Sequence, residues 1–178
     1  MQFELEDWQE TARRSFRKYL DVEVAPLVEE NEDAHRLPPP EVLQKMGEFG
    51  LLGGLLPEEQ GGAGLDYLTY CTLLCELSQV WPSLRSIVST SNLVLMMVAQ
   101  RGTRKQQERW LSDLVSGRKT AFFALTEPNV GSDASNVETR ARRDGDGWRL
   151  NGRKLYISNG TGADLGVVFA RSGDGERA

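Results

Sequence analysis

The feature that most constrains the fold of this chain is a change in the spacing of its apolar residues near residue 120. Before that point, apolar residues recur every three to five positions, which is typical of amphipathic helices. From Thr120 onward they alternate with polar residues, which is typical of strands with one solvated face. We therefore expect an α+β chain, in which an all-α helical domain (residues 1–118) precedes an antiparallel β domain (residues 119–178).

The region up to residue 118 predicts helices separated by clear stop and start sequences. Pro26 lacks a backbone N–H and is expected to kink or shorten the first helix. Asp66 and Thr103 stand where N-caps are expected, and Gln106 completes a capping box with Thr103. Residues 51–64 contain five glycines and are expected to form an ordered loop. The expected helices span residues 4–30, 41–49, 67–80, 83–100 and 103–115.

The region after residue 119 predicts strands joined by tight turns. Residues 144–147 (Asp-Gly-Asp-Gly) and 151–152 (Asn-Gly) are typical of hairpin turns. Arg140, Arg142 and Arg149 alternate with smaller or apolar residues, which predicts strands with one solvated face. A closing strand is missing from the pattern, so the sheet is expected to be incomplete. The expected strands span residues 121–125, 136–142, 148–150, 155–158 and 165–170.

Composition and charge narrow the possible functions. The net charge is −5 and the basic residues are scattered, which argues against a nucleic-acid partner. The sequence has no run of 18 apolar residues and no signal-peptide pattern, so we expect a cytoplasmic protein that does not enter a membrane. Cys71 and Cys75 are expected to be small core residues of one helix, without a disulfide or a metal. His35, the only histidine, is expected at the surface, which leaves no Ser/His or Cys/His dyad.

The stretch from residue 121 to residue 133, Ala-Phe-Phe-Ala-Leu-Thr-Glu-Pro-Asn-Val-Gly-Ser-Asp, bears most directly on function. An apolar run breaks there into a turn, in which Pro128 restricts the backbone and Gly131 frees it. The stretch is either a β-turn that joins two elements or a polar rim around a ligand. As a rim, the N–H groups around Gly131 and Ser132 would cradle a phosphate, and the main chain before the turn would pair with a heterocycle. The spacing alone leaves both interpretations open.

Three short sequences together resemble the flavin-dependent acyl-CoA dehydrogenases. Thr-Glu-Pro and Gly-Ser-Asp, at residues 126–128 and 131–133, match the signature of that family. Residues 154–160, Lys-Leu-Tyr-Ile-Ser-Asn-Gly, are similar to its second flavin segment, and residues 57–64 are similar to its Pro-Glu-Glu-Tyr-Gly-Gly-x-Gly. The resemblance covers essentially the whole chain but only the front part of a usual family member. It implies a helical N-terminal domain followed by the first part of an antiparallel β-barrel middle domain.

The resemblance also implies that the chain binds FAD, mostly through its main chain. Three residues would line the edge of the isoalloxazine ring, two turn residues would approach the diphosphate, one ring would stack, and one hydroxyl would bond near the reactive nitrogen. Tyrosine replaces the tryptophan usual in the family and serine the usual threonine, so a stacking ring and a hydroxyl donor remain. In that order, the implied cofactor residues are Phe123, Leu125, Thr126, Gly131, Ser132, Tyr156 and Ser158.

The same resemblance implies α,β-dehydrogenation of an acyl thioester. In the family, the base is a glutamate of a C-terminal domain, so no catalytic base is expected in this chain and Glu127 is expected to be structural. The sequence Arg85-Ser86-x-x-Ser89 is similar to the glutaryl-CoA dehydrogenase branch, in which the arginine pairs with a distal carboxylate. Arg85, Ser89 and Ser132 are therefore the expected substrate residues. A surface salt bridge is the alternative role of Arg85.

Several aspects of organisation stay open from the sequence. The thioester carrier is either coenzyme A or an acyl carrier protein. The chain is a fragment, one half of a split dehydrogenase, or a non-catalytic scaffold, and alone it is expected to bind FAD weakly and to lack turnover. A homo- or hetero-oligomer and an electron-transfer flavoprotein are the other expected partners.

Overall fold

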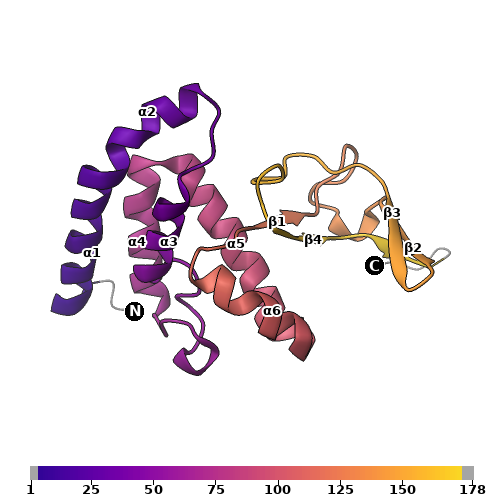
Figure 1. The fold of residues 1–178 in the computed structure, drawn as a ribbon, viewed down its shortest axis with the longest axis horizontal. Helices are drawn as coiled ribbons and strands as arrows, with labels where there is room; N and C mark the ends of the chain where they lie inside the picture. Colours follow the sequence, from indigo (N-terminus) through magenta and orange to yellow (C-terminus); the bar gives the residue numbers. More distant parts are fainter. Residues whose placement is uncertain (1–3, 174–178) are drawn as a thin grey trace.

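The computed structural model describes residues 4–173 and divides them into a helical part and a strand part (Figure 1). The helices gather at one end of the molecule and the strands follow toward the other, as the change in apolar spacing predicts. Each expected helix is confirmed, with the first one divided in two. The helices are α1 (Asp7–Tyr19), α2 (Ala25–Asp33), α3 (Pro40–Glu48), α4 (Tyr67–Val80), α5 (Pro82–Arg101) and α6 (Arg104–Val115).

A π-helical turn, Leu20–Val24, joins α1 to α2. The N–H of Ala25 donates to the carbonyl of Leu20, five residues back, rather than to a residue four back. Pro26 follows and has no N–H to donate, so the ordinary helical ladder cannot continue through this point. The kink predicted at Pro26 is confirmed.

The helical core lies where α1, α4 and α5 meet α3 and the glycine-rich loop. Phe16 packs against Phe49 with ring centroids 4.8 Å apart. Leu51, Leu52 and Leu56 of the loop are buried, so the loop is ordered as predicted. Each fully buried side chain of this size stabilises the fold by about 1.5–3 kcal/mol. The other fully buried core residues include Leu20, Met46, Leu77, Trp81 and Leu84.

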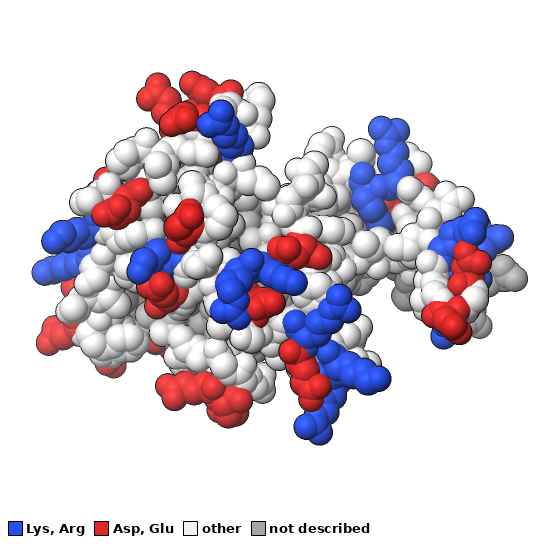
Figure 2. All heavy atoms as spheres, in the orientation of Figure 1, with Lys and Arg blue, Asp and Glu red and all other residues white. Residues whose placement is uncertain are grey.

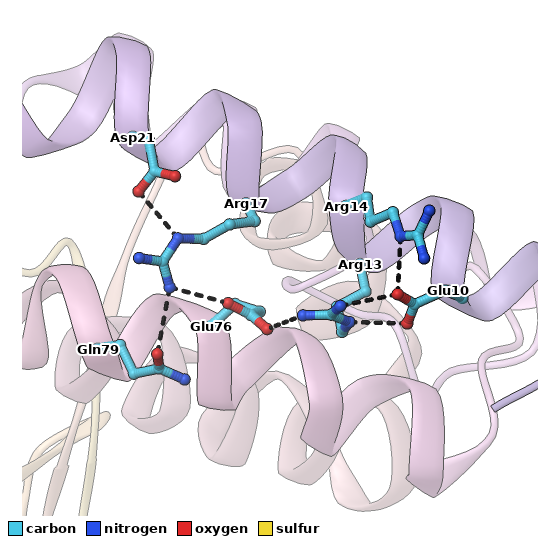
Figure 3. A network of polar contacts seen from close by, with 7 residues as sticks. All are labelled: Glu10, Arg13, Arg14, Arg17, Asp21, Glu76 and Gln79. Atoms are coloured by element: carbon cyan, nitrogen blue, oxygen red, sulfur yellow. Dashed lines mark hydrogen bonds and ion pairs between the residues drawn. The ribbon is translucent and has the colours of Figure 1, made fainter. Parts of the chain in front are cut away.

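Polar contacts fix the ends and the spacing of these helices. Asp66 caps α4 by accepting from the Thr69 N–H at 2.9 Å, and Thr103 and Gln106 form the predicted capping box of α6. Between α1 and α4, Glu76 is only 7 % exposed and accepts from Arg13 at 2.7 Å and from Arg17 at 3.1 Å (Figure 3). One buried carboxylate of α4 therefore binds arginines from two successive turns of α1.

The described strands form two small sheets. In the first, β1 (Ala121–Ala124) pairs parallel with β4 (Leu165–Val168) beside α5. In the second, β2 (Arg140–Asp144) pairs antiparallel with β3 (Gly147–Asn151) and parallel with β5 (Arg171–Ser172). These sheets do not close into a barrel within residues 4–173, and among the described strand pairs only β2–β3 is antiparallel. Residues 152–164 form a crossover loop that brings β4 alongside β1 in the same direction, so this pair is parallel.

Four details of the expected β region are wrong. Residues 155–158 are not a strand, because Tyr156 and Asn159 adopt positive φ values of 56° and 61° that interrupt an extended backbone. The expected strand 136–142 begins only at Arg140, after a 3₁₀ turn at Ala134–Asn136. Residues 151–152 are not a hairpin turn, since the chain runs on from β3 into the crossover loop. The β2–β3 hairpin is also exposed on both faces, with Trp148 54 % exposed, rather than solvated on one face only.

The expected burial of the two cysteines is wrong as well. Cys71 and Cys75 are free and exposed. Helix α4 directs Tyr70, Leu73 and Leu77 into the core, and the two cysteines lie on a different face of the same helix. When a helix has apolar residues on most sides, its sequence does not show which side faces the core.

The surface mixes both signs of charge. Figure 2 shows acidic and basic side chains interspersed over the visible face, without a large area of one sign. His35 is exposed, as predicted. Among the helices of residues 4–173, none is long and apolar enough to cross a lipid bilayer.

Candidate functional site

A cavity of about 220 Å³ opens between the end of β1, helix α5 and the crossover loop. Five of the seven residues predicted to bind a flavin line it together: Phe123, Leu125, Thr126, Tyr156 and Ser158. The remaining lining residues are Thr90, Leu93 and Ile157. The cavity is therefore lined by apolar side chains and hydroxyl-bearing side chains in similar measure.

Tyr156 gives the cavity an aromatic ring that is not committed to the protein core. Tyr156 is 89 % exposed. Its φ of 56° lies in the left-handed region, which costs an L-residue other than glycine about 1–2 kcal/mol. Such a conformation persists where neighbouring contacts fix it, and it is frequent at ligand sites.

The crossover loop is attached at both sides of Tyr156. The Leu155 N–H donates to the Thr126 carbonyl at 2.9 Å, which joins the loop to the end of β1. At the far side, the Asn159 side chain donates to the Thr120 hydroxyl at 2.9 Å. The loop thus has a defined position over the strand although it contains no regular structure.

A buried ion pair lies directly behind the cavity. Glu127 is 3 % exposed and accepts from Lys154 Nζ at 2.8 Å, from the Thr139 N–H at 2.9 Å and from the Glu138 N–H. Burial raises the pKa of the Glu127 carboxyl, but Lys154 and the surrounding donors outweigh burial and lower the pKa to about 2. Every oxygen of this carboxylate is occupied by the protein, which agrees with the structural role expected for Glu127.

Helix α5 contacts the site through hydroxyl groups. Ser86 donates a hydrogen bond to Ser158 at 3.1 Å. The side chain of the neighbouring Arg85 is exposed and, among residues 4–173, forms no ion pair or hydrogen bond, so the surface salt bridge considered for it is not seen. One turn further along, the Ser89 hydroxyl is buried without a hydrogen-bond partner in the described part of the chain. Thr90, next to it, lines the cavity.

The two turn residues predicted to approach a diphosphate lie outside the cavity lining. Gly131 and Ser132 are exposed, and a Cβ added at Gly131 would meet nothing within 4 Å. Contacts inside the turn stabilise it, because Glu127 and Val130 pair through their backbones. Asn136 and Ser135 donate to the Asp133 carboxylate and lower its pKa, which makes this carboxylate part of the turn.

Sequence reasoning missed several residues of the site. Lys154 is part of the 154–160 motif, yet its partner Glu127 lies 27 residues earlier and no local pattern connects them. Ser86 stands in the motif around Arg85 but received no role. Thr90, Leu93 and Ile157 line the cavity through the placement of α5 beside β1, which only the packed structure provides.

Comparison with family models decides the identity of the chain. The model described as acyl-CoA dehydrogenase, N-terminal domain, matches residues 6–118, and the acyl-CoA dehydrogenase middle domain matches residues 122–178. The chain belongs to the acyl-CoA dehydrogenase family. The resemblance inferred from the three short sequences is thus confirmed.

Individual members of the acyl-CoA dehydrogenase family agree with this result. The mitochondrial short-chain specific acyl-CoA dehydrogenase of Bos taurus is 40% identical over 168 residues, which is 94% of this chain and 40% of that protein. A glutaryl-CoA dehydrogenase of Mycobacterium smegmatis, solved in complex with FADH2, superposes with a TM-score of 0.87 at 34% identity, covering 96% of this chain and 44% of the other. A chain from a structure of the electron transferring flavoprotein of Acidaminococcus fermentans superposes with a TM-score of 0.83 at 37% identity. The match covers 96% of this chain and 45% of that chain. The chain therefore spans less than half the length of the proteins that it matches.

Proposed function

We propose that this chain provides the helical and flavin-binding parts of an FAD-dependent dehydrogenase that oxidises the Cα–Cβ bond of an acyl thioester. The observation that carries the proposal is the convergence of Phe123, Leu125, Thr126, Tyr156 and Ser158 on one cavity. When bound, FAD would supply a hydride acceptor. The residues of this chain would bind the ring, orient it and shield it from water.

The chemistry of the cavity fits a flavin ring. Phe123 and Tyr156 offer aromatic surface, and Ser158 offers a hydroxyl donor. The Thr126 N–H donates to no group within residues 4–173, so it is free to pair with the edge of a heterocycle. A cavity of about 220 Å³ suits the ring system and not a whole dinucleotide. We therefore assign Gly131 and Ser132 to the diphosphate, which would extend outside the cavity.

Proton removal from the substrate requires a base that the cavity lining does not include. The lining residues carry no carboxylate, and Glu127 is fully engaged by Lys154 and two backbone N–H groups. We propose that the base is supplied from outside these 178 residues, by a further segment or by a partner chain. Retention as a non-catalytic scaffold is the alternative, and it predicts that no added segment restores turnover.

The proposed substrate residues are Arg85, Ser89 and Ser132. The Arg85 guanidinium, which has no partner within residues 4–173 and lies next to the Ser86–Ser158 contact, suits a thioester with a distal carboxylate. The similarity to a glutaryl-CoA dehydrogenase supports this class, whereas the bovine relative is specific for short chains. In an enzyme reconstituted with the segment or partner proposed to supply the base, Arg85→Ala should selectively impair dicarboxylyl substrates. Equal loss with plain acyl chains would contradict the assignment.

The wider setting of the chain is also proposed by analogy with the family. We propose a cytoplasmic oligomer that takes acyl-CoA or an acyl carrier protein thioester and passes electrons to an electron-transfer flavoprotein. The division into domains at residues 118 and 119 belongs to the same proposal. Mass measurement in solution and electron-acceptor assays test these points separately.

Flavin binding is tested by mixing the purified chain with FAD, passing it through gel filtration and recording the visible spectrum. Because the chain alone is expected to bind FAD weakly, we expect a minor fraction of the flavin to elute with the protein. This fraction should fall about fivefold in Tyr156→Ala and Ser158→Ala, because a stack or a hydrogen bond is lost. Trp148→Ala removes an exposed aromatic outside the cavity and is the matched control. Wild-type chain that stays colourless at saturating FAD would refute binding by this chain alone. Acyl-CoA oxidation by the chain alone would refute an external base.

A further inference from the structure

Lys154 connects the ion pair behind the cavity to a peptide group at its edge. Its ammonium donates to the Leu125 carbonyl at 2.9 Å as well as to Glu127 at 2.8 Å. The side chain of Lys154 is 12% exposed and that of Glu127 1%. The Leu125 carbonyl and the Thr126 N–H belong to the same peptide group. Lys154 thus binds one end of a peptide group whose two residues line the cavity and whose other end, the Thr126 N–H, has no acceptor within residues 4–173.

A hydrogen bond to a peptide carbonyl changes what the N–H of that peptide can do. Chains of hydrogen bonds polarise one another, and the effect is stronger for a charged donor in a site with little water. The Thr126 N–H has no acceptor within residues 4–173, so the polarisation is available to a molecule in the cavity. Glu127 holds the ammonium in place from the opposite side.

The same residue anchors the second wall of the cavity. Lys154 precedes Leu155, whose N–H donates to the Thr126 carbonyl at 2.9 Å, and Tyr156 follows with its left-handed backbone. Both walls, the Leu125–Thr126 peptide and the Tyr156–Ser158 segment, are therefore fixed relative to one side chain.

We propose that Lys154 is a positioning residue of the cavity, which strengthens the Thr126 N–H as a donor to a bound heterocycle and locks the facing wall. The proposal rests on the flavin-binding function proposed above and extends it to a residue that does not itself line the cavity. It differs from a purely structural ion pair, because it requires an electronic change at the Thr126 amide.

The first experiment records amide ¹H and ¹⁵N chemical shifts of the 178-residue chain without ligand. Glu127→Gln keeps the ammonium on the Leu125 carbonyl, and we expect the Thr126 amide proton to shift little. Adding Lys154→Met to that variant removes the cationic donor without leaving a buried carboxylate unpaired. We expect the Thr126 amide proton to move upfield. Lys154→Arg keeps a cation at this position, and we expect the Thr126 amide shift of the wild-type chain to be retained. This variant replaces the double variant if the latter does not fold.

The second experiment measures FAD affinity in the same variants. We expect about a tenfold loss in the double variant and less than about a threefold loss in Lys154→Arg. Lys45→Met with Glu48→Gln alters an exposed lysine–glutamate pair of α3 and should change neither readout. An unchanged Thr126 shift in the double variant, or unchanged FAD affinity, would overturn the role of Lys154. If the Thr126 amide shifts as expected in the double variant but the wild-type chain binds no FAD, the polarisation by Lys154 is supported. The flavin-binding function proposed above is then refuted.

Discussion

The hydroxyl of Ser86 on α5 lies 3.1 Å from the hydroxyl of Ser158 on the crossover loop. This contact joins residues that are 72 positions apart and connects the helix that carries Arg85 to the loop that carries Tyr156. Each hydroxyl can donate or accept, so with Ser86 as the donor the proton of Ser158 is available to a ligand. The helical and strand parts therefore share one site.

Removal of the Ser86 hydroxyl should weaken FAD binding without unfolding the chain. We expect Ser86→Ala to lower FAD affinity about three- to fivefold, since Ser158 loses the contact that orients it. Fluorescence titration with FAD measures the change, and Ser83→Ala, an exposed serine of the same helix, is the control. A Ser86→Ala variant with wild-type affinity would show that the contact does not orient Ser158.

Replacement of Tyr156 should separate stability from binding. Asparagine tolerates the left-handed backbone better than tyrosine does, so Tyr156→Asn should stabilise the chain by up to about 1 kcal/mol. The same change removes the ring and should lower FAD affinity about three- to tenfold. Urea unfolding and FAD titration are run on the same sample. Loss of stability in Tyr156→Asn would contradict the strain described for this residue.

The low pKa of Glu127, about 2, predicts a specific acid sensitivity. A carboxyl whose pKa is lower in the folded than in the unfolded state stabilises the fold above the unfolded value, near 4.5. That contribution is lost as pH falls from about 4.5 toward 2. The wild-type chain should therefore lose more stability than Glu127→Gln between pH 5 and pH 3. Parallel pH slopes for the two proteins in urea unfolding would contradict the prediction.

The contact between α1 and α4 should depend on Glu76 more than on any exposed ion pair. Glu76→Gln leaves Arg13 and Arg17 without their shared carboxylate (Figure 3), and we expect a loss of about 1–3 kcal/mol in unfolding free energy. Glu48→Gln breaks the exposed pair with Lys45 and should cost less than about 0.5 kcal/mol. Equal effects of the two substitutions would show that the buried network contributes little.

The exposed cysteines give a direct check of α4. Cys71 and Cys75 should both react rapidly with a thiol reagent in the folded protein, with about two equivalents released before any denaturant is added. Cys71→Ser and Cys75→Ser should each remove one equivalent. Thiols that react only after unfolding would mean that this face of α4 is buried.

The sequence predicted those features that depend on neighbouring residues. Asp66 and Thr103 cap helices through contacts three residues away, and Pro26 breaks the ladder through its own missing N–H. The family motifs likewise identified five residues of the cavity, because each motif occupies one wall.

The features that sequence reasoning missed depend on distant contacts. The alternating pattern at residues 155–158 predicted a strand, but contacts of Lys154 and Leu155 with residues 125–127 hold this segment as a loop. The sequence also could not show that α4 turns its cysteines outward, since leucines lie on several sides of that helix. Gly131 and Ser132 have the residue types of a phosphate cradle, yet their turn lies outside the cavity lining.

The most direct test of the central claim, that the cavity between β1 and the crossover loop holds a flavin ring, is a ¹⁵N chemical-shift titration of the chain with FAD. The account predicts that the amides of Leu125, Thr126, Tyr156 and Ser158 shift together and saturate at one dissociation constant, with Thr90 and Leu93 following. Shifts that cluster instead in the β2–β3 hairpin, or no shifts at saturating FAD, would contradict it.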